Sequence, residues 1–293
     1  MKRYRYIKSD AFTQGESLGN PAACVFTGDE TLAPEQMLAI AKEHQGFVME
    51  MVFCGRSEVG DCKLTYYSSE CEVDFCGHGT IATMYSYIKE HDALLNKEEI
   101  VVETNRKGVI KVYNGIPADD AVFVEAPAPT EYPVTASVKD IAEALHLPED
   151  AVDRSHPVRL IDAGLRTLIV PVCTLDVEIS TYPSIEQLKQ FAVEQGIDIF
   201  LIYTMQVADA SSFAHTRVFA PRFGYLEDPA TGSGNSAFAN YLLQERMWDG
   251  HLISIEQGGN DRIYNAVKLK TAEGKVLFGG RATVKIEGEY VVR

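Results

Sequence analysis

Short runs rich in apolar residues, some of them strictly alternating with polar ones, cover most of the first half of the chain and are typical of β-strands. Two other stretches, residues 31–44 and 79–90, carry apolar residues at helical spacing, and Pro34 suits the first turn of the earlier one. The pattern predicts mixed α and β structure. The expected strands occupy residues 4–12, 22–26, 47–53, 63–67, 100–104, 108–113 and 121–125.

A segment with three prolines in nine residues, 125–133, interrupts this pattern and predicts a linker. The pattern then restarts, so the chain separates into a first domain of residues 1–125 and a second of residues 126–280. The expected helices of the second half are residues 137–147, 184–195 and 234–247, and its expected strands are 157–162, 167–172, 198–205, 211–220, 252–256, 263–270 and 275–288.

A glycine, a polar residue and a second glycine introduce a helix twice in the chain. The sequence CGHGTIATMYSYI aligns with TGSGNSAFANYLL, which places Gly77 on Gly232 and Gly79 on Gly234, 155 residues later. Because this offset is about half the chain, a duplicated domain is the simplest explanation.

Three interpretations of these glycine turns are open. Both match the shortened dinucleotide fingerprint G-x-G-x-x-A, but acidic, turn-like residues precede them where that fingerprint needs a strand. The first turn of a helix also offers unpaired N–H groups to a carboxylate or an enolate oxygen, and glycine lets such a ligand approach closely. The plainest interpretation is that each glycine only permits a tight turn. The repetition favours an anionic small molecule held between the two turns.

Polar side chains at or near these turns are candidates for chemistry. His78 and Ser233 hold equivalent positions between glycines, and Asp228 lies five residues before Ser233, although such residues also serve as helix caps. Glu50 lies in FVMEMVF with apolar neighbours on both strand faces. A buried carboxylate is costly unless function requires it, as general acid/base catalysis does. The alternative is an edge strand that leaves Glu50 in water.

Composition and charge narrow the class of protein. The net charge of −15 disfavours nucleic acid and anionic membrane surfaces as partners. No apolar run approaches the length of a membrane span or follows the charged start as a signal peptide would. The six cysteines show no CxxC spacing, which predicts reduced thiols and a cytoplasmic protein. Cys71, Cys76 and His78 lack the spacing of a closed zinc site, so no metal is expected.

At these residues the chain resembles the PhzF (phenazine biosynthesis-like) isomerase family, which shares its fold with diaminopimelate epimerase and proline racemase. DAFTQGESLGNPAACVF resembles the opening segment of that family, FCGHGT its Gly-His turn and EDPATGSG its most specific motif. The resemblance implies an α+β fold of two duplicated domains, each a curved β-sheet or barrel wrapped around a central helix, with the active site in the cleft between them. It further implies a final strand, about residues 281–293, that returns to the first domain, and a homodimer.

The resemblance also implies a cofactor-independent isomerase that moves a proton between carbons of a small carboxylate metabolite in a biosynthetic process. Glu50 would be the acid/base, and His78 and Asp228 would bind and polarise the substrate. Glu50 here lies between Met49 and Met51 rather than in Ser-Glu-Thr, so Glu43 and His44 are alternative assignments. The implied substrate-binding residues are Asn20, Gly77, Gly79, Gly232, Ser233 and Gly234.

Cys76 leaves the chemistry open, because it stands where the racemase and epimerase relatives carry a catalytic thiol. Thr231 takes the place of the partner thiol. A thiol at a helix N-terminus has a lowered pKa and can act as a base, whereas the other interpretation is a small buried filler. An active Cys76 would indicate an amino-acid epimerase or a hydroxy-amino-acid dehydratase. A third alternative is a binding protein without catalysis. Candidate substrate contacts are Arg166, Arg217 and Arg222.

Overall fold

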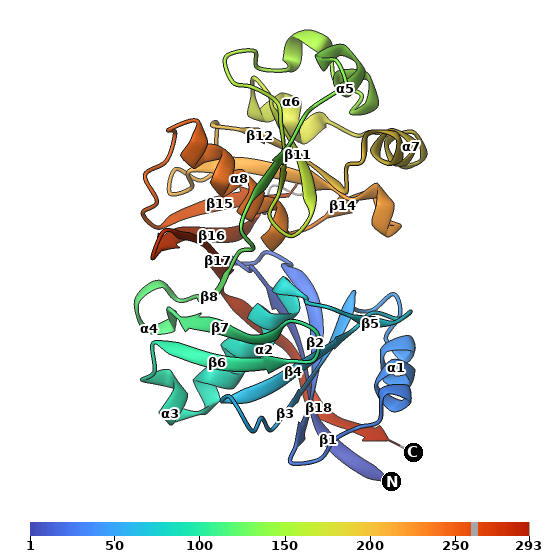
Figure 1. The fold of residues 1–293 in the computed structure, drawn as a ribbon, viewed down its shortest axis with the longest axis vertical. Helices are drawn as coiled ribbons and strands as arrows, with labels where there is room; N and C mark the ends of the chain where they lie inside the picture. The colour runs from blue at the N-terminus through green and yellow to red at the C-terminus, as the bar shows by residue number, and fades with distance from the viewer. Residues whose placement is uncertain (259–262, 293) are drawn as a thin grey trace. The chain divides into compact units, whose positions relative to one another are not determined.

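The computed structural model describes residues 1–258 and 263–292, and the chain divides there into two compact units. Unit 1 consists of residues 1–124 with 279–292, and unit 2 of residues 125–278. In each unit a curved sheet wraps around one helix (Figure 1). None of the helices in the described part of the chain is long and apolar enough to cross a bilayer.

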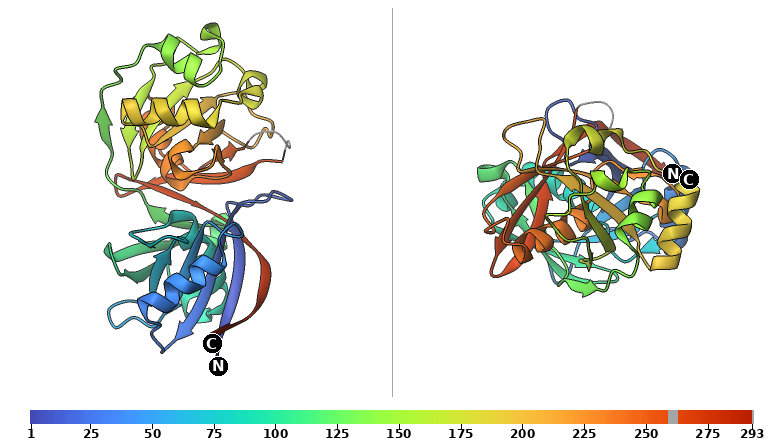
Figure 2. Two further views of the ribbon diagram at one scale, coloured as in Figure 1. Left: turned by 90° about the vertical axis from the view of Figure 1, so that its right-hand side faces the viewer. Right: turned by 90° about the horizontal axis from the view of Figure 1, so that it is seen from above.

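Unit 1 contains the first and the last strand of the chain, and these two strands pair antiparallel. Lys2 lies opposite Val292, so the two ends of the described chain lie side by side (Figures 1 and 2). Its helices are α1 (Pro34–Glu43), α2 (Gly77–Glu90), α3 (Asp92–Leu95) and α4 (Ile116–Asp119). Its strands are β1 (Lys2–Ala11), β2 (Asn20–Gly28), β3 (Glu50–Gly55), β4 (Cys62–Tyr67), β5 (Glu72–Val73), β6 (Glu99–Thr104), β7 (Gly108–Asn114), β8 (Val122–Glu125), which continues one residue into unit 2, and β18 (Ala282–Val292).

Unit 2 contains α5 (Val138–Ala144), α6 (Leu175–Ser180), α7 (Ile185–Gln195) and α8 (Gly232–Gln244), with 3₁₀ turns at Glu149–Ala151 and Pro221–Phe223. Its strands are β9 (Thr130–Tyr132), β10 (Arg159–Asp162), β11 (Arg166–Pro171), β12 (Ile199–Thr204), β13 (Ala214–Phe219), β14 (Glu227–Asp228), β15 (Ile253–Gln257), β16 (Asn265–Ala272) and β17 (Lys275–Gly280), which ends in unit 1.

The two units repeat one order of strand pairing. In unit 1, β2 pairs parallel with β3, β3 antiparallel with β4, β4 parallel with β6, and β6 antiparallel with β7. In unit 2, β11, β12, β13, β15 and β16 follow the same order with the same directions. The short strands β5 and β14 pair with the ends of β4 and β13 and lead into α2 and α8. The predicted α+β fold of two duplicated, helix-centred units is confirmed.

The central helices are buried on nearly every side, which explains why their sequences carry so few charged residues. In α2 the run from Gly79 to Ser86 is buried without interruption, and in α8 the run from Gly234 to Leu242 is buried. A helix that is apolar all round is stable only inside a protein core. The sheet of unit 1 therefore has two apolar faces, one on α2 and one on α1, where Met37 and Ile40 pack near Met51 and Phe53.

Four expectations about strands and connecting segments differ from the structure. The proline-rich segment 125–133 contains β9, which pairs with β10, so it is not a plain linker. The strand expected at 47–53 begins only at Glu50. The single strand expected at 275–288 is divided into β17 and β18 at Arg281. The acidic segments before α2 and α8 are not simply turns, because each contains a strand of two residues. A strand that short shows no alternation of apolar and polar residues, so the sequence did not predict it.

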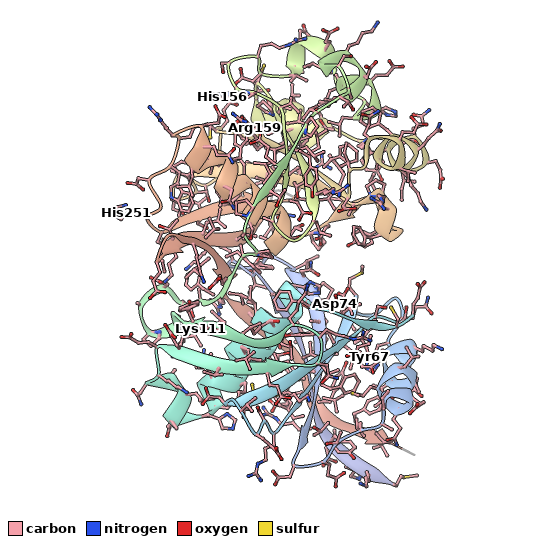
Figure 3. The ribbon with its side chains drawn as sticks, viewed as in Figure 1. Tyr67, Asp74, Lys111, His156, Arg159 and His251 are labelled. Atoms are coloured by element: carbon pink, nitrogen blue, oxygen red, sulfur yellow. The ribbon has the colours of Figure 1, made fainter. Side chains whose placement is uncertain are left out.

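Arg159, which is labelled in Figure 3, connects three parts of unit 2. From β10, its guanidinium lies 2.6 Å from Glu131 in β9 and 2.6 Å from Glu245, the C-cap residue of α8. Planar guanidinium groups suit two carboxylates at once. This ion-pair network therefore fixes the end of the central helix against the sheet.

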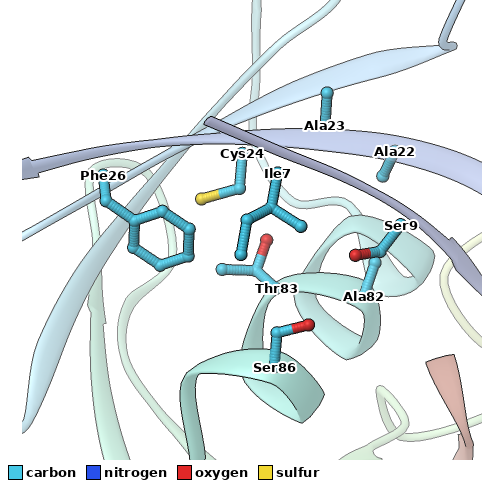
Figure 4. Close-up of a pocket in the computed structure, with 9 residues that line it drawn as sticks. All are labelled: Ile7, Ser9, Ala22, Ala23, Cys24, Phe26, Ala82, Thr83 and Ser86. Carbon is cyan, nitrogen blue, oxygen red and sulfur yellow. The ribbon is translucent and has the colours of Figure 1, made fainter. Parts of the chain in front are cut away.

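A narrow gap separates α2 from β1 and β2 in unit 1 (Figure 4). Its lining is mostly apolar, with Ile7, Cys24 and Ala82 among the residues. Two serine hydroxyls also line it, those of Ser9 and Ser86. Both are buried, and neither has a hydrogen-bond partner among the residues that the structure describes. A buried hydroxyl without a partner destabilises the fold because it has lost its bonds to water.

Two acidic residues and two basic residues form a buried group in unit 2. The side chains of Glu178 in α6 and His215 in β13 are fully buried, with Glu178 Oε2 at 3.0 Å from His215 Nδ1. Arg217, also fully buried, donates to both carboxylate oxygens of Glu227 at 2.9 and 2.8 Å.

Burial raises the pKa of Glu178 well above its usual range. This effect is larger than the lowering by Arg217, and Glu256 and Glu227 add to the rise. Burial, reinforced by Arg217, lowers the pKa of His215 to about 3. At neutral pH Glu178 is therefore protonated and His215 is neutral, so the pair is uncharged and its one titratable proton belongs to Glu178.

The substitution Ser86→Ala should raise the free energy of unfolding by about 1 kcal/mol, because it removes an unpartnered buried hydroxyl and favours the helix. The matched control is Ser236→Ala in α8, where the hydroxyl donates to the carbonyl of Gly232 at 2.7 Å. That variant should lose stability. Urea unfolding of both variants measures the difference, and a loss in both would contradict the assignment of Ser86.

The Glu178–His215 pair predicts a pH dependence of stability. Between pH 4.5 and 6.5, the ordinary pKa values of the two groups, the folded and the unfolded pair each hold one proton, so the contribution of the pair is constant. Above 6.5 the unfolded pair loses the histidine proton while folded Glu178 keeps its own. Folding then takes up a proton, and stability falls by up to about 1.4 kcal/mol per pH unit. Below 4.5 the unfolded pair binds a second proton, and stability falls again.

Urea unfolding at pH 6, 7 and 8 measures this slope. Glu178→Gln keeps a neutral hydrogen-bonding side chain and should remove the part of the slope that begins at 6.5. Glu186→Gln, at an exposed position of α7, is the control and should keep the slope of the parent chain. Equal slopes in the parent chain and in Glu178→Gln would show that the buried pair is not neutral.

Candidate active site

The start of α2 brings a thiol and an imidazole together in unit 1. The helix begins at Gly77, two residues earlier than expected, and Cys76 is its N-cap residue. The Cys76 sulfur accepts a hydrogen bond from the backbone N–H of Gly79 at 3.2 Å. A Cβ atom on residue 79 would lie 2.9 Å from that sulfur and 3.0 Å from Val52, so glycine is needed for this close approach. The first turn then holds His78, whose ring nitrogens lie 3.6 and 3.8 Å from the Cys76 sulfur.

Glu50 reaches the same helix start from the sheet. It is the first residue of β3, opposite Ala22 of β2, and it shares a strand face with Val52, which contacts α2. Glu50 Oε2 lies 3.2 Å from His78 Nε2, and the two side chains are 22% and 16% exposed. The structure thus brings Glu50, His78 and Cys76 together, although they are separated by up to 28 residues. The alternative of a solvated edge-strand glutamate is wrong.

The carboxylate of Glu50 keeps an acceptor available. Its Oε2 atom is buried, and within residues 1–258 and 263–292 its only polar contact is the ion pair with His78 Nε2, which lacks good hydrogen-bond geometry. Most buried acceptors in proteins have a well-formed hydrogen bond, so this atom requires an explanation. An acceptor held in place at the start of a helix suits a group that receives a proton from a ligand.

The pKa values of Cys76 and His78 shift in the direction of their protonated forms. Burial raises the pKa of the Cys76 thiol by more than the neighbouring His78 lowers it. The lowered thiol pKa expected from the helix terminus is therefore not found, because desolvation outweighs the helix. Burial alone would lower the pKa of His78, but the Cys76 sulfur and the Glu50 carboxylate raise it by more and hold it well above its usual range. A neutral thiol adds no charge, so with Cys76 protonated the imidazolium form of His78 depends on the Glu50 carboxylate.

These three residues also carry donor atoms of the kinds that bind metals. One atom from each of Glu50, Cys76 and His78 lies within 4.8 Å of the other two. Cys71, which precedes Cys76 and His78 in the sequence, is exposed and lies outside this group. Glu50 was missed as a ligand because it is distant in sequence, and only the fold places it beside the helix start.

The alternative assignments for the glutamate lie elsewhere in unit 1. Glu43 is the last residue of α1 and accepts a hydrogen bond from the hydroxyl of Tyr290. His44 is the C-cap of the same helix and bonds the carbonyl of Ile40 through Nδ1 at 2.8 Å. Both therefore belong to α1, on the face of the sheet opposite α2.

Asn20 and Gly19 form a tight entry into β2. Gly19 has φ +69°, and a Cβ atom there would lie 2.6 Å from the carbonyl oxygen of Ala11. Only glycine fits such a position. Asn20 is buried and pairs with Ala11 in the sheet. The GlyAsnPro segment is therefore fixed against β1.

The start of α8 in unit 2 has the same backbone design with different side chains. Thr231 is the N-cap residue, and its hydroxyl donates to Asp228 Oδ2 at 2.6 Å. Gly232 lies against Phe278, and a Cβ atom there would approach the ring to 2.4 Å. Ser233 lies beside Gly164, whose added Cβ would be 3.6 Å from that of the serine. The structure therefore holds Asp228 beside the N-cap residue of α8, the helix whose first turn contains Ser233.

Gln257, which the sequence analysis missed, organises that helix start. Its fully buried amide accepts from the N–H of Thr231 at 2.9 Å and from Asn235 at 2.7 Å. It also donates to the Asp228 carbonyl at 2.8 Å and to the Thr231 hydroxyl at 3.0 Å. All four hydrogen-bonding positions of the amide are used. Gln257 is the last residue of β15, and nothing in the sequence around it predicts this role.

The three candidate arginines are engaged within unit 2. Arg217 donates to Glu227 and to the carbonyls of Glu178, Ile179 and Thr181, so it is a structural residue rather than a substrate contact. Arg222 lies 2.6 Å from Asp198. Arg166 lies over the ring of Tyr132 at 4.4 Å.

Comparisons with known proteins support the resemblance seen in the sequence. The model of the family described as "Phenazine biosynthesis-like protein" matches residues 9–288. The uncharacterized isomerase YfhB of Bacillus subtilis (strain 168) is 28% identical over 295 residues, which cover 99% of this chain and 97% of the relative. A crystal structure of the Bacillus anthracis phenazine biosynthesis protein of the PhzF family is 26% identical, with a TM-score of 0.86 and all of both chains covered.

A more distant likeness concerns the fold alone. The crystal structure of a hydroxyproline epimerase from Agrobacterium vitis with bound trans-4-OH-L-proline is 10% identical, with a TM-score of 0.57. The match covers 98% of this chain and 92% of the epimerase. The expected relation of the fold to epimerases and racemases is confirmed.

The glycines at the third position of α2 and α8 should differ in their tolerance of a side chain. Gly79→Ala should cost about 1–3 kcal/mol of unfolding free energy, because the new methyl meets the Cys76 sulfur and Val52. Gly234→Ala should change stability by less than about 1 kcal/mol, since its nearest contact is the flexible end of Ile199 at 3.3 Å and alanine favours the helix. Thermal unfolding compares the two variants, and an equal loss in both would contradict the packing of the thiol.

Proposed function

The chain belongs to the phenazine biosynthesis-like family, and we propose that it is an isomerase that moves a proton between two carbons of a small carboxylate-bearing metabolite. The name of the Bacillus subtilis relative, an isomerase that matches over nearly the whole chain, supports the reaction class. The observation that carries the mechanism is the Glu50 carboxylate, buried at the start of α2 beside His78 with an acceptor atom available.

In the proposed reaction Glu50 acts as acid and base. Its carboxylate takes a proton from a carbon next to a carbonyl or carboxyl group, and the C–H electron pair moves into that group. The resulting carboxyl of Glu50 returns the proton to a second carbon of the conjugated system. Because no electron is gained or lost, proton transfer alone completes the cycle, and the proposed reaction is independent of a cofactor.

The start of α2 would stabilise the enolate-like intermediate. The His78 imidazolium supplies a positive charge at 3.2 Å from the carboxylate, and the backbone N–H groups from Gly77 onward supply the positive end of the helix. These charges are fixed before the reaction, so they need not reorganise when the anion forms. Such preorganised donors are typical of enzymes that stabilise oxyanions.

In unit 2, we assign anion binding to the start of α8, with Ser233 and the backbone of Gly232 and Gly234. Asp228 is held there by the hydroxyl of Thr231. That this helix start and the one in unit 1 serve the same substrate stays a prediction. Asn20 is assigned to the substrate-binding set through its fixed position next to Gly19.

The alternative that Cys76 is the base has less support. The thiol caps α2 through Gly79, and burial raises its pKa, so it is protonated at neutral pH. A protonated thiol is a poor base. Its place 3.6 Å from His78 still leaves an epimerase or dehydratase as the second candidate function.

Proton exchange in deuterated water tests the role of Glu50. The purified chain is incubated, in the presence of a chelator, with small carboxylates that carry an acidic C–H bond, such as amino acids, cyclic imino acids and unsaturated acids. Loss of the carbon-bound proton signal by NMR identifies a substrate. Glu50→Gln should slow this exchange by about 10³-fold. Glu43→Gln, whose carboxylate binds Tyr290 on the other face of the sheet, should exchange at the parental rate.

The remaining alternatives separate in the same assay. If Glu50→Gln keeps full activity, the proposal for Glu50 is wrong. Cys76→Ser keeps a small hydrogen-bonding cap, so exchange should stay within about tenfold of the parental rate, whereas a loss as large as that of Glu50→Gln would favour the thiol mechanism. A ligand that stabilises the protein against heat but shows no exchange would indicate a binding protein.

A further inference from the structure

We propose that Glu50, Cys76 and His78, here called the donor cluster, bind one zinc-type divalent cation. The carboxylate, thiol and imidazole are the three ligand types that Zn²⁺ prefers, and one atom of each lies within 4.8 Å of the others. The three residues come from β3, the N-cap of α2 and its first turn. They are therefore fixed by the sheet and the helix rather than by a loop.

Two distances within the donor cluster are close to the edges of a zinc tetrahedron. Zinc–ligand bonds of about 2.3 Å to sulfur and 2.0–2.1 Å to nitrogen or oxygen place ligand atoms about 3.6 Å apart for sulfur and nitrogen, and about 3.3 Å apart for nitrogen and oxygen. The Cys76 sulfur lies 3.8 Å from His78 Nε2, and this nitrogen lies 3.2 Å from Glu50 Oε2. Because the sulfur is also 3.6 Å from Nδ1, it lies beside the ring, and the imidazole has to turn for one cation to reach both Nε2 and the sulfur.

The hydrogen bonding of the cluster favours such a ligand. Glu50 Oε2 is buried and lies 3.2 Å from His78 Nε2, so a cation that replaces the proton between these two atoms would keep both of them bonded. The side chains of Glu50 and His78 are partly exposed, which leaves a path for an ion and a fourth position for water. Three protein ligands and one open position are typical of zinc sites that exchange their fourth ligand.

Binding would compete with proton transfer. The cation displaces the thiol proton of Cys76 and the proton of His78 at Nε2 to the buffer, and forms bonds to sulfur, nitrogen and Glu50 Oε2. Glu50 can then no longer accept a proton from carbon. This consequence rests on the function proposed above, and it makes the cation an inhibitor.

Spectroscopic titration without substrate tests the donor cluster. The reduced, chelator-treated full chain is titrated with Co²⁺, which gives a thiolate charge-transfer absorption when it binds a cysteine, and then with competing Zn²⁺. One equivalent of cobalt should bind with this absorption. Cys76→Ser should abolish the absorption and weaken Zn²⁺ binding by at least about 100-fold. Cys71→Ser, which removes an exposed thiol five residues earlier, is the matched control and should leave both unchanged.

Two further variants keep the test decisive. Glu50→Gln retains the thiol cap of α2 and should weaken Zn²⁺ binding while the thiolate absorption persists at higher cobalt concentrations. Glu43→Gln should bind like the parent chain. Failure of the folded parent chain to bind one equivalent, or an absorption that survives Cys76→Ser but is lost in Cys71→Ser, would overturn the proposal. Because the exchange assay contains a chelator and this titration contains no substrate, each proposal can fail without the other.

Discussion

A helix that starts inside a protein core must find partners for its first N–H groups, and both central helices of this chain face that constraint. At the start of α2 the sulfur of Cys76 accepts the N–H of Gly79, and the absence of a side chain on Gly79 allows the sulfur to approach. The first turn then carries His78 into contact with Glu50 on the neighbouring strand. The cap, the glycine and the ion pair therefore depend on one another.

The two units satisfy this constraint in different ways, and the difference indicates where chemistry can occur. In unit 2 the N-cap Thr231, Asn235 and the carbonyl of Asp228 bond to the amide of Gln257, which has no free position left. In unit 1 the corresponding N-cap is a thiol, and the nearby Glu50 Oε2 has only the ion-pair contact with His78 within the described part of the chain. A saturated network is rigid and inert, whereas an unsaturated acceptor can take a proton or a cation. The two units therefore share one fold and differ in the residues at the N-caps of their central helices, Cys76 and Thr231.

The sequence predicts features that depend on neighbouring residues in the chain. It does not predict features that depend on which strands and helices meet in the fold. The two glycine turns, the duplication and the placement of Glu50 on a strand could be predicted, because spacing and apolar periodicity carry them. The role of Gln257 could not, since it depends on β15 ending beside α8. The burial of Glu178 with His215 was equally hidden, because α6 and β13 meet only in the fold. The reversal of the expected Cys76 pKa has the same origin: a helix terminus is visible in the sequence, but the depth of its burial is not.

Burial also explains why we propose the Glu50 carboxylate as the base rather than the Cys76 thiol. Removing a thiol from water disfavours its charged form, and the one cation nearby, His78, lies between Cys76 and Glu50. The imidazolium can compensate only one full negative charge in this small space, and its Nε2 lies closer to the carboxylate, at 3.2 Å, than to the sulfur, at 3.8 Å. The sulfur also accepts the N–H of Gly79, which a neutral thiol can do without ionising. The geometry therefore pairs Glu50 with His78 and gives Cys76 the structural bond, which supports the proposal that proton abstraction begins at position 50.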